Sequence, residues 1–141
     1  MKDLLKKLNF KDQKRIVILN AEEAFIQSVS EELNGVIIDK AVDQRCPYEF
    51  MLVFVKKAVE VEEIAPVVLH NLTADGIIWF CYLKKSSVNH SADLDRDHGW
   101  DALNRAGLFS VRMVSIDKNW SAVRFRNGRY IRSSSKHTEI K

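Results

Sequence analysis

The stretch Arg15-Ile16-Val17-Ile18-Leu19-Asn20-Ala21-Glu22-Glu23-Ala24-Phe25 decides the fold of this chain. Its first part is apolar without alternation, which predicts a strand buried on both faces, as in a parallel sheet. A helix from about Ala21 to Leu33 follows at once, and Asn34-Gly35 ends it as a C-cap. We expect Asn20 to cap that helix, with Glu23 in capping-box spacing. A strand that passes directly into a helix indicates the first unit of an α/β domain.

The turn between this strand and helix lacks the glycines of a phosphate-binding loop. Such a loop lets backbone N–H groups approach a pyrophosphate, and the helix N-terminus adds about half a positive charge. Here Glu22 and Glu23 place two carboxylates in the first helical turn, so a phosphate would meet like charges. We therefore expect no dinucleotide at this turn and no cofactor in the domain.

Strand and helix patterns alternate along the rest of the chain. Apolar runs predict strands at 36–38, 50–55 and 77–83; helical spacing predicts helices at 2–9, 60–72 and 94–106; the segment 109–126 predicts two strands around a turn at 117–119. Within these, Pro66 is expected to kink its helix, and 74–76 is expected to form a turn before the strand.

This alternation predicts an α/β fold with three layers, in which helices cover both faces of a mostly parallel, Rossmann-like sheet. We expect the strand order 2-1-3-4-6-5, closed by a C-terminal antiparallel hairpin. That pattern resembles the fold of S-adenosylmethionine-dependent methyltransferases, shortened by one strand–helix unit. Length and composition predict one domain over residues 1–131 and a flexible tail over 132–141.

Charge is unevenly distributed around a net value of +3. Residues 1–15 carry a net charge of +4 and residues 118–141 carry +6, which leaves −7 for the acidic body. Basic ends indicate either a nucleic-acid contact or ends that lie against the acidic body. No stretch resembles a signal peptide or a membrane span, so we expect a cytoplasmic protein without a membrane partner. Cys46 and Cys81 lack CxxC spacing, and Cys81 is expected to be a small buried hydrophobe.

Ligands of open α/β sheets bind at the carboxyl ends of the strands. The candidates there are basic, hydroxyl and acidic residues around the end of the fourth strand: Lys84, Lys85, Ser86, Ser87, Arg96 and Asp97. They predict either an anion site or a solvated loop before a helix whose own acids stabilise its first turn. Asp39 follows the first turn at about the spacing of a ribose-binding acid, but without the glycines we interpret it as a surface residue.

The last hairpin is rich in arginine. Arg124 and Arg126 share one strand face, and Arg129 follows shortly after. These three residues predict either a contact with nucleic-acid phosphates or charges that discourage pairing at a sheet edge. Both interpretations stay open.

Four blocks of sequence resemble a family of short, uncharacterised α/β proteins classed as a domain of unknown function. The blocks are 17–21 with Phe25, 79–82 with 84–87, 96–103, and 115–117 with 120–126. The likeness covers residues 10–131, although Glu22 and Ala24 stand where the family has a proline and a glycine. The resemblance implies a methyltransferase-like Rossmann fold and no assigned activity, so no catalytic residue is carried over.

The residues thus favour a non-catalytic, Rossmann-like module that binds a small molecule or a protein partner. One alternative is a methyltransferase-like enzyme that uses S-adenosylmethionine. Another is a nucleic-acid contact through the basic C-terminal hairpin. The sequence has no nucleophile elbow, Cys/His pair or HExxH motif, so we predict neither catalytic nor metal-binding residues.

Overall fold

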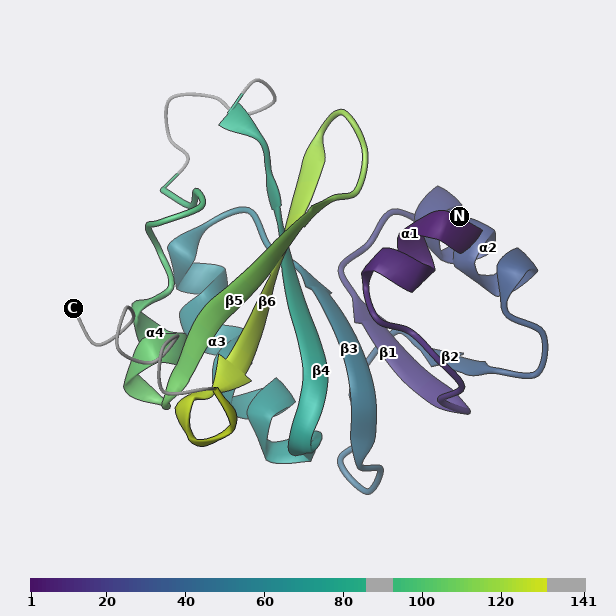
Figure 1. Ribbon diagram of the computed structural model, residues 1–141, viewed down its shortest axis with the longest axis horizontal. Helices are drawn as coiled ribbons and strands as arrows, with labels where there is room; N and C mark the ends of the chain where they lie inside the picture. The colour runs from purple at the N-terminus through teal and green to yellow at the C-terminus, as the bar shows by residue number, and fades with distance from the viewer. Residues whose placement is uncertain (86–92, 132–141) are drawn as a thin grey trace.

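A computed structural model describes residues 1–85 and 93–131 of the chain (Figure 1). Its elements are α1 (Lys2–Lys7), β1 (Arg15–Leu19), α2 (Glu23–Glu32), β2 (Ile37–Asp39), β3 (Tyr48–Phe54), α3 (Ala58–Asn71), β4 (Leu72–Leu83), α4 (Asp101–Arg105), β5 (Leu108–Ser115), β6 (Trp120–Asn127) and the 3₁₀ turn η2 (Gly128–Tyr130). The predicted tail at 132–141 lies outside the described residues, as do Ser86 and Ser87.

The strands form one sheet in the order β2-β1-β3-β4-β6-β5, as the sequence predicts. β2, β1, β3 and β4 run parallel, whereas β6 is antiparallel to both β4 and β5. The carboxyl ends of β1, β3 and β4 therefore meet at one edge, together with the turn that joins β5 to β6 (upper edge in Figure 1). We call it the carboxyl edge.

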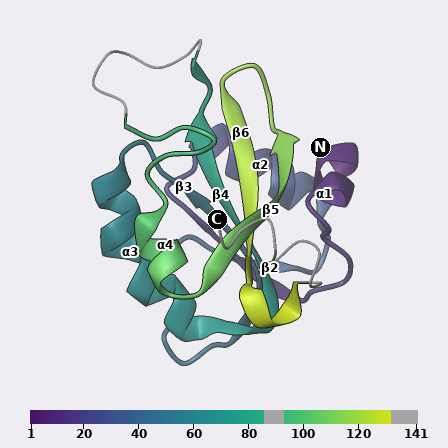
Figure 2. The same ribbon diagram turned by 60° about the vertical axis from the view of Figure 1, so that its left-hand side comes forward.

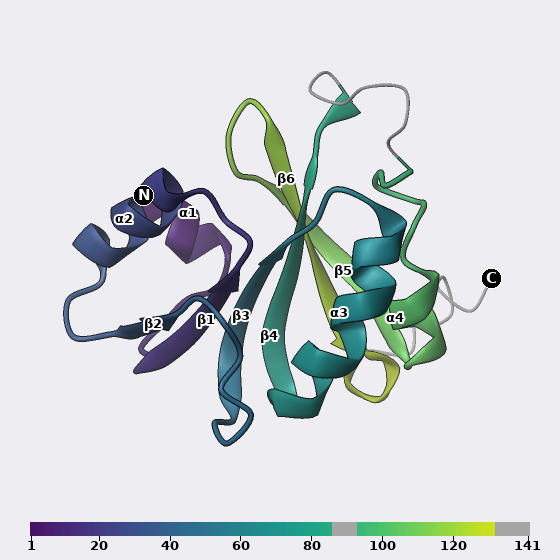
Figure 3. The ribbon, with the colours of Figure 1, turned by 180° about the vertical axis from the view of Figure 1, so that it is seen from behind.

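Helices cover both faces of the sheet: α3 and α4 lie on one face and α1 and α2 on the other (Figures 2 and 3). Each face has its own buried apolar cluster, since successive side chains of a strand point to opposite faces. On the α1 side, the indole Nε1 of Trp79 donates to the Leu8 carbonyl at 2.9 Å and ties α1 to the centre of the sheet. In the described part of the chain, no helix is long and apolar enough to cross a membrane.

Asn20 does not cap α2, so that prediction is wrong. The helix begins at Glu23, two residues later than expected, with Glu22 at its N-cap and no side-chain bond there. Asn20 instead adopts φ +63° directly after β1, and its amide donates to the Phe54 carbonyl at 3.3 Å. Asparagine tolerates this left-handed conformation better than most residues, so it serves where a glycine would otherwise be needed.

The helix predicted at 94–106 is confined to its last third, α4. Before it, one carboxylate oxygen of Asp95 accepts bonds from the backbone N–H groups of Asp97 and His98, at 2.8 and 2.9 Å. Such local bonds compete with helical ones. The carboxylate of Asp93, the residue directly before the predicted helix, accepts the backbone N–H of Ala58 at the start of α3, 2.8 Å away, and so belongs to another helix.

Helix α3 includes Pro66, which lies exposed, so water can reach the carbonyl that loses its helical partner; the expected kink there stays a prediction. One further local prediction differs from the structure. The segment 74–76 lies within β4 rather than before it, as an irregularity where Asp75 takes φ +55° and the pairing with β3 shifts register. By contrast Cys81 is fully buried as predicted, and burial raises the pKa of its thiol.

Candidate functional site

Three adjoining cavities lie along the carboxyl edge, and we call them together the edge trough. The central pocket, of about 320 Å³, is lined by Asn20, Phe54, Lys56, Glu60 and Trp120. It shares Phe54 and Trp120 with the aromatic pocket, of about 330 Å³. It shares Asn20 and Glu60 with the apolar slot, of about 410 Å³. The three cavities therefore follow one another from α1 to α3, across the ends of β1 and β3.

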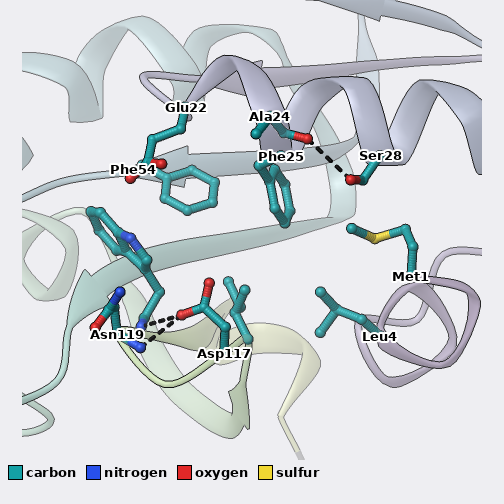
Figure 4. Close-up of a pocket in the computed structure, with 11 residues that line it drawn as sticks. Met1, Leu4, Glu22, Ala24, Phe25, Ser28, Phe54, Asp117 and Asn119 are labelled. Atoms are coloured by element: carbon teal, nitrogen blue, oxygen red, sulfur yellow. Dashed lines mark hydrogen bonds between the residues drawn. The ribbon is translucent and has the colours of Figure 1, made fainter.

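The aromatic pocket lies between α1, the start of α2 and the β5–β6 turn (Figure 4). Phe54 forms its floor, in edge contact with Phe25 at 5.2 Å and with Trp120 at 5.0 Å between ring centroids. The exposed carboxylate of Glu22 lies on its rim. Rings beside a carboxylate favour a cationic guest, because both attract positive charge.

The carboxylate of Asp117, also on the wall of this pocket, holds the β5–β6 turn in place. Its Oδ1 accepts the backbone N–H groups of Asn119 and Trp120, each at 2.8 Å. This agrees with the turn that the sequence predicts at 117–119. Trp120, the next residue, is 9% exposed: it packs in the core and also lines the trough.

The central pocket contains one fixed acid and one exposed cation. Glu60, in the first turn of α3, accepts the backbone N–H of Lys56 with its Oε1 at 2.7 Å. That bond fixes the carboxylate at the junction with the apolar slot and leaves Oε2 for other partners. The Lys56 side chain is exposed at the same pocket.

Asp39 does not serve the trough, because two groups of the protein already hold its carboxylate. Its Oδ2 accepts Arg15 Nε at 2.7 Å and the Tyr48 hydroxyl at 2.5 Å. The pKa of Arg15 rises, chiefly through the bond to Asp39. Burial, and then the bond to Asp39, raises the pKa of Tyr48 to about 12. This network joins the edge strand β2 to β1 and β3 rather than binding a ribose.

The residues predicted around the end of β4 are only partly brought together. Lys84 turns to the β5–β6 hairpin, where its Nζ donates to Ser115 Oγ at 2.7 Å and to the Asp117 carbonyl at 2.6 Å. Lys85 is exposed. Arg96 and Asp97 are both exposed and 4.0 Å apart, a weak surface pair. A ligand held by these residues stays a prediction.

The three arginines predicted for nucleic-acid contact have different surroundings. Arg126 forms a two-pronged pair with Asp75, with both N···O distances 2.7 Å. Arg124 lies on the same face of β6 and is half-buried. Arg129 is exposed in η2, beyond the end of the strand.

The sheet order, with its antiparallel closing strands, defines the fold class as methyltransferase-like. Among solved structures it is similar to N-methyltransferase NodS from Bradyrhizobium japonicum WM9 in complex with S-adenosylhomocysteine, with a TM-score of 0.56 and 10% identity over 89% of this chain and 86% of that chain. It is also similar to the glycopeptide N-methyltransferase MtfA complexed with sinefungin, with a TM-score of 0.56 and 7% identity over 89% and 91% of the two chains.

A third similar structure is phosphoethanolamine N-methyltransferase 2 from Haemonchus contortus with S-adenosylmethionine. Its TM-score is 0.53 at 8% identity, and the likeness covers 90% of this chain and 38% of that longer one. No family model and no curated protein sequence matches the chain. Its resemblance to a family of unknown function therefore stays a prediction, while the methyltransferase-like fold is confirmed.

These neighbours contradict the expectation that the domain takes no cofactor, because proteins of this fold are solved with S-adenosylhomocysteine and S-adenosylmethionine. The physical error lies in the choice of ligand. Glu22 and Glu23 repel a phosphate, but S-adenosylmethionine has no phosphate and carries a positive sulfonium. The carboxylate of Glu22, on the rim of the aromatic pocket, favours such a group rather than excluding it, whereas Glu23 is paired with Lys40 at 3.2 Å.

The sequence predictions concentrated on the ends of β1 and β4 and missed two residues of the trough. Phe54 is the last residue of β3, and Glu60 lies in the first turn of the helix that follows. Both positions are typical of ligand sites in this kind of sheet, so the same rule that selected Lys84 could have selected them.

Proposed function

We propose that the edge trough binds S-adenosylmethionine and its demethylated product, and that the protein is a methyltransferase-like domain. The observation that carries this proposal is the row of three adjoining cavities along the carboxyl edge of a methyltransferase-like sheet. From α3 to α1 they are the apolar slot, the central pocket with the acid Glu60 and the cation Lys56, and the aromatic pocket.

The apolar slot fits the adenine ring. Its side chains include those of Ala41, Val42, Ile64 and Val67, around a cavity of about 410 Å³. Apolar walls with a few polar groups are typical of sites for flat heterocycles. Since Asp39 is held by Arg15, the acid for the ribose hydroxyls is Glu60, whose Oε2 is not used by the bond to Lys56.

The central pocket fits the amino-acid end of the ligand. Lys56 supplies a positive charge for its carboxylate, and Glu60 supplies a negative charge for its sulfonium and amino groups. The rings of Phe54 and Trp120 form the wall toward the aromatic pocket and add a cation–π attraction. When bound, S-adenosylmethionine supplies an electrophilic methyl group, and the aromatic pocket next to it is left for a methyl acceptor.

Thermal unfolding with added ligands tests this proposal. A ligand that binds only the native state raises the melting temperature, increasingly with concentration. We expect such a rise with S-adenosylmethionine and S-adenosylhomocysteine but not with ATP, whose phosphates meet Glu22 and Glu23. Absence of a rise with either adenosyl ligand at millimolar concentration would contradict the proposal.

Two glutamine variants of α3 locate the site. Glu60→Gln keeps an acceptor for the Lys56 N–H but removes the charge, and we expect about tenfold weaker binding by calorimetry, or about 1.4 kcal/mol. Glu62→Gln removes the same charge from an exposed position on the same helix, away from the trough, and is expected to bind normally. Equal affinities of the two variants would place the ligand elsewhere.

A further inference from the structure

Three arginines lie on one face of the β5–β6 ribbon, on the same side of the sheet as α1. Val123 and Phe125 point into the cluster under α3 and α4, so Arg124 and Arg126 point the other way. Arg112 of β5 is the direct cross-strand partner of Arg124. Like charges directly opposite each other destabilise an antiparallel pair, which makes this arrangement unfavourable without a counter-charge.

Among the described residues, only one of the three has an acidic group in direct contact, and the same acid acts on Arg124 at longer range. Asp75 takes both its carboxylate oxygens to Arg126. Arg112 is exposed and donates to the neutral side-chain oxygen of Asn9 at 3.2 Å, just after α1. The Nε atom of Arg124 is buried and has no hydrogen-bond partner within residues 1–85 and 93–131.

Within the described part of the chain, the arrangement leaves one buried hydrogen-bond donor unpaired and two like charges opposite each other, and both destabilise the folded protein. A buried donor without an acceptor destabilises the folded state, more so when it is charged. Burial, and then the nearby Arg126 charge, lowers the pKa of Arg124, as expected for a cation in a place that already has excess positive charge. The buried Nε presents no surface to an external ligand, but an anion held between the exposed Arg112 and the half-buried Arg124 side chain would relieve the repulsion between the two guanidinium groups.

We propose that Arg112 and Arg124 bind a backbone phosphate of single-stranded nucleic acid that lies along the β5–β6 ribbon. A guanidinium presents its donors in a planar fork that matches phosphate oxygens, and two of them can hold one phosphate from both sides. Phe109, the cross-strand partner of Arg126, lies half-exposed on the same face and offers a ring on which a base can stack.

A chain-like polyanion fits this face better than a small anion does. The arginines lie along a ribbon rather than in a cavity, and the segment that adjoins them through Asn9 belongs to residues 1–15, with a net charge of +4. Trp120 of the trough lies on the same face of β6, four residues from Arg124, which is about 13 Å at roughly 3.3 Å per residue. The inference stands without the proposed function, because the residues that would contact the nucleic acid, Arg112, Arg124 and Phe109, do not line the trough.

Fluorescence anisotropy with a labelled 16-nucleotide oligouridine tests the proposal at 50 and 200 mM salt. We expect the full chain to bind, and Arg112→Gln with Arg124→Gln to weaken binding at least tenfold. The slope of log affinity against log salt should also fall by about 0.7, since the two arginines share one phosphate and each phosphate contact on a single strand contributes about 0.7. The matched control, Arg45→Gln with Arg105→Gln, removes the same charge from exposed arginines that pair with Asp43 and Glu62.

Three results would overturn the proposal: no binding of the full chain at 50 mM salt, an equal loss in the control variant, or displacement of the RNA by polyglutamate at equal charge. The last result would assign the face to acidic protein segments. Arg112→Gln alone repeats the test at an exposed position if the double variant does not fold, with at least a threefold loss expected.

Discussion

The side-chain amide of Asn20 donates to the carbonyl oxygen of Phe54, 3.3 Å away, and so joins the ends of β1 and β3 beneath the edge trough. The same residue holds φ +63°. Asn20→Gly keeps that backbone conformation and loses only the bond, so we expect a loss of about 1 kcal/mol in the free energy of unfolding. Asn20→Ala also incurs strain, for a total of about 2 kcal/mol. Urea unfolding of both variants measures the difference, and equal losses would show that the bond alone matters.

The Tyr48 hydroxyl gives the protein a predictable response to alkaline pH. Burial and the bond to Asp39 raise its pKa from 10.0 to about 12. Between these values the unfolded state releases its proton first, so the contribution of Tyr48 is complete below pH 10 and is lost as the pH rises toward 12. We expect Tyr48→Phe to be less stable at pH 8 but to lose less stability than the wild type from pH 10 to 11. Urea midpoints at these pH values measure both trends; parallel declines would exclude Tyr48 as their source.

The pair of Asp75 and Arg126 predicts a dependence at acid pH. The bond from Arg126 lowers the pKa of Asp75, so its stabilisation is present above the ordinary value of 3.8 and is lost as the pH falls further. Asparagine tolerates φ +55°, and Asp75→Asn removes the charge together with one of the two acceptor oxygens, at an expected cost of about 1 kcal/mol at pH 7. The gap between variant and wild type should narrow by pH 3. A gap that is constant from pH 7 to pH 3 would contradict the ion pair.

Alanine substitutions at two glycines with positive φ distinguish the cost of backbone strain from the cost of steric overlap. A Cβ on Gly99, at φ +100°, would lie 2.3 Å from Leu94 Cδ2 and 3.0 Å from the Asp93 carbonyl. A Cβ on Gly107, at φ +89°, would have only Asn127 Nδ2 at 3.9 Å. We expect Gly107→Ala to cost about 1 kcal/mol and Gly99→Ala about 3 kcal/mol in unfolding free energy. Similar costs would mean that the loop before α4 yields to the added methyl group.

The sheet could be predicted from sequence because its determinants are local. The unbroken apolar run of β1 and the helical spacing of α3 each specify an element without reference to the rest of the chain. The closing hairpin around Asp117 is equally local, since that carboxylate accepts the backbone N–H groups two and three residues later in its own turn. Strand order then follows from the small number of topologies that such an alternation allows.

The parts that escaped prediction depend on partners far away in the sequence. Asp93 belongs to the start of α3, 35 residues earlier, so its proximity to the next helix in sequence is misleading. The carboxylate of Asp39 is bound by Arg15, which lies 24 residues earlier, and no rule of sequence spacing predicts that pair. The trough itself depends on the register of β1 against β3, which places Asn20 beside Phe54 and Glu60. The expectation of no cofactor failed for a different reason, because it considered only the repulsion of a phosphate and not ligands without one.

Met1 lines the aromatic pocket together with Leu4, and this has a practical consequence for laboratory work. Any residues placed ahead of Met1, such as an affinity tag, would emerge at the mouth of that pocket and compete with a small guest. Ligand screens are therefore best made with the tag at the other end or removed. A preparation that binds only after cleavage of its leading tag would report on the pocket as directly as a point mutation would.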